Sequence, residues 1–125
     1  MVRKILVVDD EADLRSLIQT CLEIKGGWQV IATGSGVEAL KEARNQQPDA
    51  ILLDLMMPEM DGFAVLQKLR SSDKTKHIPV VLLTAKGRSI ETTQFDRFNV
   101  LGTIKKPFNP MKLAEQIESL LSQSC

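Results

Sequence analysis

The sequence predicts an α/β fold, a doubly wound sheet of five parallel strands with helices on both faces. Short aliphatic runs such as Ile5–Val8 lack the polar alternation of a half-exposed strand, as expected of parallel strands that are covered on both sides. Each run is followed by a segment whose apolar residues recur at helical spacing. Five strand-helix units in strict succession imply parallel strands that are joined by right-handed crossovers.

The predicted strands are the aliphatic and β-branched runs, and turn-forming residues separate them from the helices. Pro48-Asp49, for example, leads into the third run, which ends at Leu53 or slightly beyond. In chain order the predicted strands are Ile5–Val8, Trp28–Ala32, Ala50–Leu53, Ile78–Leu83 and Gly102–Lys105.

The first two helices are predicted from an end signal and a start signal. Gly26-Gly27 stops the first helix. Ser35 opens the second, because Ser35 to Glu38 has the Ser-x-x-Glu form of a capping box. The apolar residues that recur at helical spacing are Leu14, Leu17, Ile18, Cys21 and Leu22 in the first helix and Val37, Leu40 and Ala43 in the second.

Three further helices complete the pattern. Asp61-Gly62 begins the third, and a more polar helix over Ile90–Phe98 is expected to end at Asn99 in a left-handed conformation. Asn109-Pro110 supplies an N-cap and a proline at the first position of the fifth helix. The apolar positions are Phe63, Leu66 and Leu69 in the third helix and Leu113, Ile117, Leu120 and Leu121 in the fifth.

Length and composition favour one domain over residues 1–125, since the 125-residue chain has no internal repeat, low-complexity tract or linker. Sixteen basic residues balance sixteen acidic ones, so no net positive field draws the chain to nucleic acid or an anionic membrane. The first residues do not resemble a signal peptide, and we expect no membrane span because no apolar segment approaches the required length. Cys21 and Cys125 cannot form a disulfide framework, and we expect a cytoplasmic protein with unpaired thiols.

Chemically active residues stand where four of the predicted strands end. Asp9-Asp10 follows the first strand, Asp54 the third, Thr84 the fourth and Lys105-Lys106 the fifth. Ligands of open α/β sheets bind beyond the carboxyl ends of the strands. The sequence therefore predicts that carboxylates, a hydroxyl and an ammonium group converge at one edge of the sheet.

Asp54 interrupts the apolar run ILLDLMM, where an ionised carboxylate is costly unless a nearby charge compensates it. A lysine supplies one positive charge, and Mg²⁺ fits the remaining carboxylates because it prefers oxygen ligands. An aspartate, a bound Mg²⁺, a lysine and a threonine hydroxyl together are equipped for phosphoryl transfer. This reasoning predicts that Asp54 is an acceptor of phosphate.

Four motifs, one at each of these strand ends, resemble those of the response-regulator receiver domain of two-component signalling. They are VVDDE, DLMMPEMDG, LLTAK and KKPF, and the resemblance extends from end to end of the chain. Each motif alone is modest, but all four in this order are very specific. The resemblance, which is to single-domain, chemotaxis-regulator-like receivers, implies a flavodoxin-like (βα)5 fold with strand order 2-1-3-4-5 and one receiver domain over residues 1–125.

The resemblance implies a Mg²⁺ site at the acidic end. Asp10 would be a direct ligand, and Asp9 would be its partner in the acidic pocket, acting through water. The phosphorylated residue Asp54 would also place its carboxylate on the metal. The backbone carbonyl of Met56 would be a further ligand.

The resemblance also assigns the phosphate-binding groups. Thr84 would bind a phosphoryl oxygen, and Lys106 would pair with the phosphate. Strand-end position alone leaves Lys105 and Lys106 as alternatives, and the Lys-Pro-Phe match selects Lys106. Receivers commonly carry Tyr or Phe three positions before this lysine, where the present chain has Thr103. Aromatic-switch coupling in its usual form is therefore not expected.

The expected function is a phosphorylation-activated switch that receives its phosphoryl group from a sensor histidine kinase or a phosphotransfer protein. The chain would catalyse only its own phosphotransfer and autodephosphorylation, so it is not expected to be an enzyme acting on other substrates. Its output would pass through protein contacts on the fourth helix, fifth strand and fifth helix, without direct contact to nucleic acid or membrane.

Three other functions fit the sequence less well. A phosphorylation-independent interaction module usually lacks the acidic pair, the acceptor or the lysine, all of which are present here. A haloacid-dehalogenase-type phosphatase places Asp-x-Asp after the first strand, which Asp9-Asp10-Glu11 does not match. A flavin carrier needs a Ser/Thr/Gly-rich phosphate loop there, and these acids would repel a phosphate.

His77 precedes Ile78-Pro79 and is interpreted as a solvated loop residue rather than a phosphoryl relay.

Overall fold

The computed structural model describes residues 3–55, 62–85, 100–106 and 108–123. Five parallel strands form one sheet in the order β2-β1-β3-β4-β5. The strands are β1 (Lys4–Val8), β2 (Gln29–Thr33), β3 (Ala50–Asp54), β4 (Val80–Ala85) and β5 (Val100–Lys106). The helices are α1 (Ala12–Gly26), α2 (Gly36–Gln46), α3 (Gly62–Ser71) and α5 (Leu113–Gln123), with the 3-10 helix η1 (Pro110–Lys112) before α5. The predicted fold class and strand order are confirmed, and the helix predicted at 90–98 lies outside the described residues.

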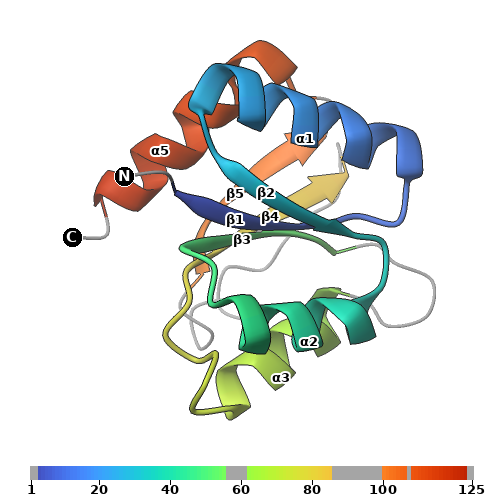
Figure 1. Cartoon of the computed structure of the whole chain (residues 1–125), viewed down its shortest axis with the longest axis vertical. Helices are drawn as coiled ribbons and strands as arrows, with labels where there is room; N and C mark the ends of the chain where they lie inside the picture. Colours follow the sequence, from blue (N-terminus) through green and yellow to red (C-terminus); the bar gives the residue numbers. More distant parts are fainter. Residues whose placement is uncertain (1–2, 56–61, 86–99, 107, 124–125) are drawn as a thin grey trace.

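The sheet lies between two helical layers, with α1 and α5 on one face and α2 and α3 on the other (Figure 1). Successive strand residues point to opposite faces, so each strand contributes to two separate cores. The strand residues packed with α2 and α3 are Leu6, Val8, Ile51, Leu53, Val80 and Leu82. Those packed with α1 and α5 are Ile5, Val7, Ala50, Leu52, Val81, Leu83 and Ile104. This double burial explains why the strands read as continuous aliphatic runs.

The predicted helix signals are largely observed. Gly27 ends α1 in the left-handed conformation, with φ of 66°. The Ser35 hydroxyl accepts a hydrogen bond from the Glu38 N–H at 3.4 Å, which is half of a capping box; the return bond from the Glu38 side chain is not among the described contacts. The Asn109 side chain accepts from the Met111 N–H at 3.0 Å and thereby caps η1, which continues directly into α5.

Two apolar residues of these helical patterns lie outside the core. Leu17 is 44% exposed and Val37 is 61% exposed. The buried face of α1 is centred on Ile18 and Leu22, one position along from Leu17. In α2 the sheet is contacted by small residues such as Ala39, and Val37 lies in the first turn away from that contact. Apolar spacing alone does not say which of two neighbouring apolar residues turns to the sheet.

Strand boundaries also shifted slightly. β4 begins at Val80 rather than Ile78, because Ile78 is held in a turn by its hydrogen bond to the Thr75 carbonyl. β5 begins at Val100 rather than Gly102, since Val100 pairs with Val80 ahead of an irregularity in the ladder. These shifts lie at the amino ends of the strands, away from the edge where the strand-end residues gather.

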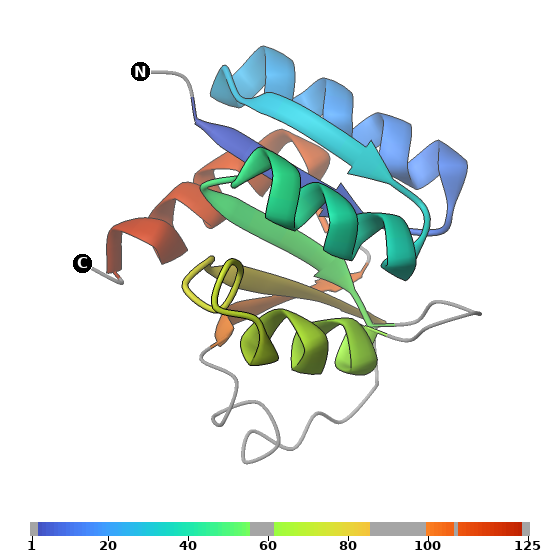
Figure 2. The same ribbon diagram turned by 60° about the horizontal axis from the view of Figure 1, so that its bottom comes forward.

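The carboxyl ends of all five strands lie at one edge of the sheet, and Figure 2 shows the arrowheads of β1, β2 and β3 reaching it together.

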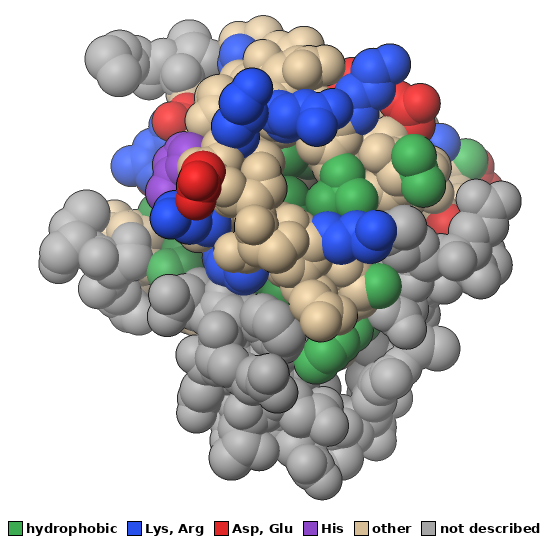
Figure 3. Space-filling view, turned by 90° about the horizontal axis from the view of Figure 1, so that it is seen from below, with side chains coloured by type: hydrophobic (Ala, Val, Ile, Leu, Met, Phe, Trp, Pro, Cys, Tyr) green, Lys and Arg blue, Asp and Glu red, His purple; other side chains and the backbone are tan. Residues whose placement is uncertain are grey.

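The outer face of α2 and α3 carries many Lys and Arg side chains (Figure 3). Arg44 in the last turn of α2 and Lys68 and Arg70 in that of α3 suit the negative ends of the helix dipoles. Among the described helices, none has both the length and the apolar character that crossing a membrane requires.

Candidate functional site

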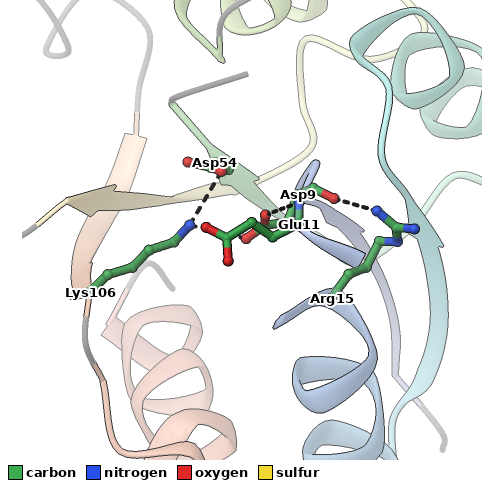
Figure 4. A network of polar contacts seen from close by, with 5 residues as sticks. All are labelled: Asp9, Glu11, Arg15, Asp54 and Lys106. Carbon is green, nitrogen blue, oxygen red and sulfur yellow. Dashed lines mark hydrogen bonds and ion pairs between the residues drawn. The ribbon is translucent and has the colours of Figure 1, made fainter. Parts of the chain in front are cut away.

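A charged network joins the ends of three strands (Figure 4). The Lys106 Nζ atom, at the end of β5, lies 3.2 Å from Asp9 Oδ2 and 3.3 Å from Asp54 Oδ2. Asp9 directly follows β1, and Asp54 is the last residue of β3. The lysine is therefore shared between two carboxylates that come from different strands.

The strand period explains why these three side chains meet. The Asp9 N–H donates to the Thr33 carbonyl at 3.1 Å, so the extended pairing of β1 with β2 continues through this residue. Each site residue then lies two positions after a residue of the core beneath α1 and α5: Asp9 after Val7, Asp54 after Leu52 and Lys106 after Ile104. Because residues two apart share a face of the sheet, the three charged groups share that face as well.

The charged groups of this network are largely buried, so each carboxylate needs a nearby positive charge. Asp9 is 0% and Asp54 is 2% exposed, whereas Asp10 is exposed. Burial lowers the pKa of Lys106, but the negative charges of Asp54 and Asp9 and the hydrogen bond to Asp54 raise it by more, so this pKa lies above its ordinary value of 10.5. The Glu11 N–H also donates to Asp9 Oδ1 at 2.9 Å. Asp54 and Asp9 therefore stabilise the protonated, positively charged form of Lys106.

The acidic group as a whole fits a hard divalent cation. Asp9, Asp10 and Asp54 each offer a carboxylate oxygen, and these atoms lie within 4.8 Å of one another. Asp9 Oδ2 is buried and accepts no hydrogen bond from the described residues; its contact with Lys106 is an ion pair. One lysine cannot neutralise three carboxylates, and oxygen donors are the ligands that Mg²⁺ prefers. Met56, predicted to add a backbone carbonyl, lies outside the described residues.

Thr84 is a buried residue near the carboxyl end of β4. Its position follows from the register, because Asp54 pairs with Leu83 and Thr84 is the next residue of β4. The side chain is 0% exposed, and its hydroxyl has no hydrogen-bond partner within the described ranges. A buried hydroxyl without a partner costs on the order of 1–3 kcal/mol, so a ligand that accepts its hydrogen bond would be stabilised here.

The structure separates the two lysines that strand-end position alone left open. Lys106 lies in the network, whereas the neighbouring Lys105 is exposed. Thr103 is also exposed on β5, so a small side chain occupies the position where receivers commonly carry an aromatic one. His77 is exposed in the connection before β4, as expected of a solvated loop residue.

Two contacts of the site were not foreseen from the sequence. Arg15 of α1 donates from Nη1 to the Asp9 backbone carbonyl at 2.7 Å. Gly62, predicted only as a helix start, lies against the backbone that follows Asp54, where its N–H donates to the Leu55 carbonyl at 3.1 Å. Both contacts join segments that are distant in sequence or separated by a loop, and local patterns carry no signal for them.

Gly62→Ala is expected to lower the free energy of unfolding by about 1–3 kcal/mol, the usual cost of overpacking. A Cβ atom at Gly62 would lie 2.5 Å from the Asp54 carbonyl oxygen and 2.7 Å from the Leu55 Cα atom, and backbone cannot yield as a side chain can. Urea denaturation measures the effect. Gly102→Ala is the matched control: its Cβ would meet the end of the flexible Leu120 side chain at 2.9 Å, so its cost should be clearly smaller. Equal losses of unfolding free energy in the two variants would contradict the proposed clash with the Asp54 and Leu55 backbone.

The chain is similar to known proteins over nearly its whole length. A family model described as the response regulator receiver domain matches residues 5–118. The Pyropia yezoensis protein named Probable transcriptional regulator ycf27 is 39% identical over 121 residues, which cover 97% of this chain and 48% of that protein. The alkaline phosphatase synthesis transcriptional regulatory protein PhoP of Bacillus subtilis is 36% identical over 124 residues, covering 99% of this chain and 50% of that protein. This chain thus spans about half the length of both relatives.

Solved structures show the same fold. The chemotaxis protein CheY4 of Vibrio cholerae superposes with a TM-score of 0.87 at 28% identity, covering 96% of this chain and 99% of that one. The match extends over nearly the whole of both chains, so the arrangement of strands and helices around the strand-end site is shared.

Proposed function

Because the chain belongs to the response regulator receiver family of two-component signalling, we propose that it is a phosphorylation-activated switch with Asp54 as the phosphate acceptor. The observation that carries the proposal is the Lys106 ammonium group, which contacts the buried carboxylates of both Asp9 and Asp54. A shared cation of this kind supports a site in which negative charge increases when a phosphoryl group arrives.

The reaction uses Asp54 as a nucleophile toward a phosphohistidine of a sensor histidine kinase or phosphotransfer protein. One carboxylate oxygen forms a bond to phosphorus while the phosphorus–nitrogen bond breaks, and the released imidazole nitrogen keeps the electron pair and takes up a proton. Lys106 pairs with the phosphoryl oxygens, and the Thr84 hydroxyl donates a hydrogen bond to one of them. The buried Thr84 hydroxyl, without a partner among the described residues, supports this last role.

Asp9, Asp10 and Asp54 would hold Mg²⁺, with the backbone carbonyl of Met56 as the further ligand that the family pattern implies. When bound, Mg²⁺ supplies positive charge that offsets the charge developing on the phosphoryl oxygens. Asp9 is kept in place by the Glu11 N–H and by Lys106, so its carboxylate needs little reorganisation. Asp10 is exposed and is reached from solvent.

The proposal also includes where the chain acts and which surface contacts its partners. The chain catalyses only its own phosphotransfer and autodephosphorylation, acts in the cytoplasm and does not itself contact nucleic acid or membrane. Its output surface is formed by β5, α5 and the helix predicted at 90–98, which lies outside the described residues. Since Thr103 provides no aromatic ring, the phosphorylated state is signalled by backbone shifts or other side chains.

The test is phosphoryl uptake from acetyl phosphate, followed by intact mass. With Mg²⁺ the wild-type chain is expected to gain one phosphoryl group, and Asp54→Ala none. Asp10→Ala should lose the dependence on Mg²⁺, because a ligand is removed. Asp73→Ala, which removes an exposed aspartate that forms an ion pair with Lys76, is the control and should behave as wild type. A wild-type chain that gains no phosphate from acetyl phosphate or from a partner kinase would instead be a phosphorylation-independent interaction module.

A further inference from the structure

Arg15 holds the backbone that carries the acidic pair. Its Nη1 atom donates to the Asp9 carbonyl at 2.7 Å, and this oxygen belongs to the peptide that links Asp9 to Asp10. Figure 4 shows Arg15 on the opposite side of Asp9 from Lys106. A hydrogen bond from a charged guanidinium group is about twice as strong as one between neutral groups, and its planar fork has a fixed direction. The orientation of this peptide is therefore set from α1.

Gly34 provides the space for this guanidinium group. A Cβ atom at position 34 would lie 2.6 Å from Arg15 Nη1, 3.4 Å from Arg15 Cζ and 3.6 Å from the Asp9 carbonyl oxygen. The neighbouring Thr33 carbonyl accepts from the Asp9 N–H at 3.1 Å. Both backbone groups of Asp9 are thus bonded, one to the end of β2 and the other to Arg15, which lies against the residue after β2.

We propose that Arg15 is a positioning residue of the phosphorylation site, and that the missing side chain of Gly34 leaves room for the Arg15 guanidinium group. Resting on the proposed function, this inference assigns to Arg15 the task of fixing the Asp9–Asp10 peptide, so that both carboxylates face the cation. The hydrogen bond of Arg15 goes to the Asp9 backbone and not to one of the carboxylates that would hold the cation. Groups that orient metal ligands in this way typically contribute 10- to 100-fold in metal affinity.

The direction of the change in Mg²⁺ affinity distinguishes a positioning role of Arg15 from a purely electrostatic one. Arg15→Gln removes a positive charge near an acidic cation site, so electrostatics alone would tighten Mg²⁺ binding. Loss of positioning weakens it. Gly34→Ala leaves the charge unchanged but places a methyl group where the guanidinium lies, so it should weaken binding in the same direction. Gly34 is not among the glycines with a left-handed backbone conformation, and the nearest atom that an alanine Cβ would meet there is Arg15 Nη1.

The experiment is calorimetric titration of the intact chain with Mg²⁺ and no phosphate donor, at a temperature where each variant is folded by circular dichroism. Arg15→Gln and Gly34→Ala are each expected to raise the Kd about tenfold. Arg44→Gln, an equal loss of charge on the exposed side of α2, should change it less than twofold. Arg15→Lys keeps the charge without the fork and is expected to weaken binding as well.

Equal or tighter Mg²⁺ binding by Arg15→Gln and Gly34→Ala would overturn the positioning role. If both variants still take up phosphate on Asp54 as wild type does, the proposed function stands while this inference fails. If the wild-type chain binds no Mg²⁺, the metal site of the proposed function and this inference fail together. Should Arg15→Gln not fold, Gly34→Ala and Arg15→Lys decide the question.

Discussion

Lys106→Met is expected to abolish stable phosphoryl uptake and to lower the free energy of unfolding by up to about 3 kcal/mol at pH 7. Methionine preserves the apolar stem but leaves the buried carboxylates of Asp9 and Asp54 without their shared cation. Breaking a buried ion pair on one side costs about 3–5 kcal/mol, and the low end applies because the Lys106 side chain is 19% exposed. Urea denaturation in chelator measures the loss.

Lys105→Met is the matched control, since Lys105 is the adjacent, exposed lysine of β5. Its effect on the free energy of unfolding should stay within about 0.5 kcal/mol, as is usual for surface substitutions. Comparable losses in the two variants would show that the Lys106 network does not stabilise the fold.

The contribution of Lys106 should also depend on pH in a defined direction. Its pKa in the folded chain is raised above 10.5, chiefly because the charges of Asp54 and Asp9 outweigh the opposing effect of burial. A raised pKa stabilises the fold fully below the unfolded value, and the stabilisation is lost as the pH rises through the folded value. The stability difference between wild type and Lys106→Met should therefore be constant from pH 7 to about 10 and shrink above that range.

Asp54→Asn is expected to unfold at a higher temperature than wild type when chelator is present. The substitution relieves repulsion from Asp9 and Asp10, whose carboxylates lie with that of Asp54 within 4.8 Å, and sacrifices one attraction to Lys106. Unit charges about 4 Å apart interact by about 4 kcal/mol at an effective dielectric constant of 20. The lost attraction cancels one of the two relieved repulsions, and screening reduces the remaining one to a net gain of about 1–2 kcal/mol. That corresponds to a shift of several degrees in Tm.

Added Mg²⁺ should reduce this difference, because a cation that binds the folded wild type stabilises it by mass action and already offsets the repulsion. Differential scanning calorimetry in chelator and in excess Mg²⁺ provides the comparison. Asp73→Asn serves as the control, as this exposed residue should show no Mg²⁺-dependent difference. The same Tm difference for Asp54→Asn with and without Mg²⁺ would count against the electrostatic explanation.

The convergence of Asp9, Asp54 and Lys106 could be predicted from the sequence because it follows from topology. Parallel strands place their carboxyl ends at one edge, so residues at strand ends meet even when they are far apart in the chain. The choice between Lys105 and Lys106 needed the family resemblance. The structure gives its physical reason, since Lys106 lies two residues after the buried Ile104 and shares its face of the sheet.

Other features depend on how closely distant segments approach, which no local pattern records. Gly62 lies against the Asp54 carbonyl, and Gly34 leaves room for the Arg15 guanidinium. The exposure of Leu17 and Val37 has a similar origin, because the rotation of a helix on the sheet is decided by all the residues that pack there. Helical spacing correctly predicted the helices α1 and α2 but not their exact orientation.

The central claim is that Asp54 carries the phosphoryl group, and chemical mapping of the modified residue tests it most directly. Borohydride reduces an aspartyl phosphate to homoserine, which peptide mass spectrometry locates in the chain. After treatment with acetyl phosphate and Mg²⁺, homoserine is expected at position 54. Homoserine at position 9 or 10, or a phosphoryl group that resists reduction because it is on a serine or threonine, would contradict the claim.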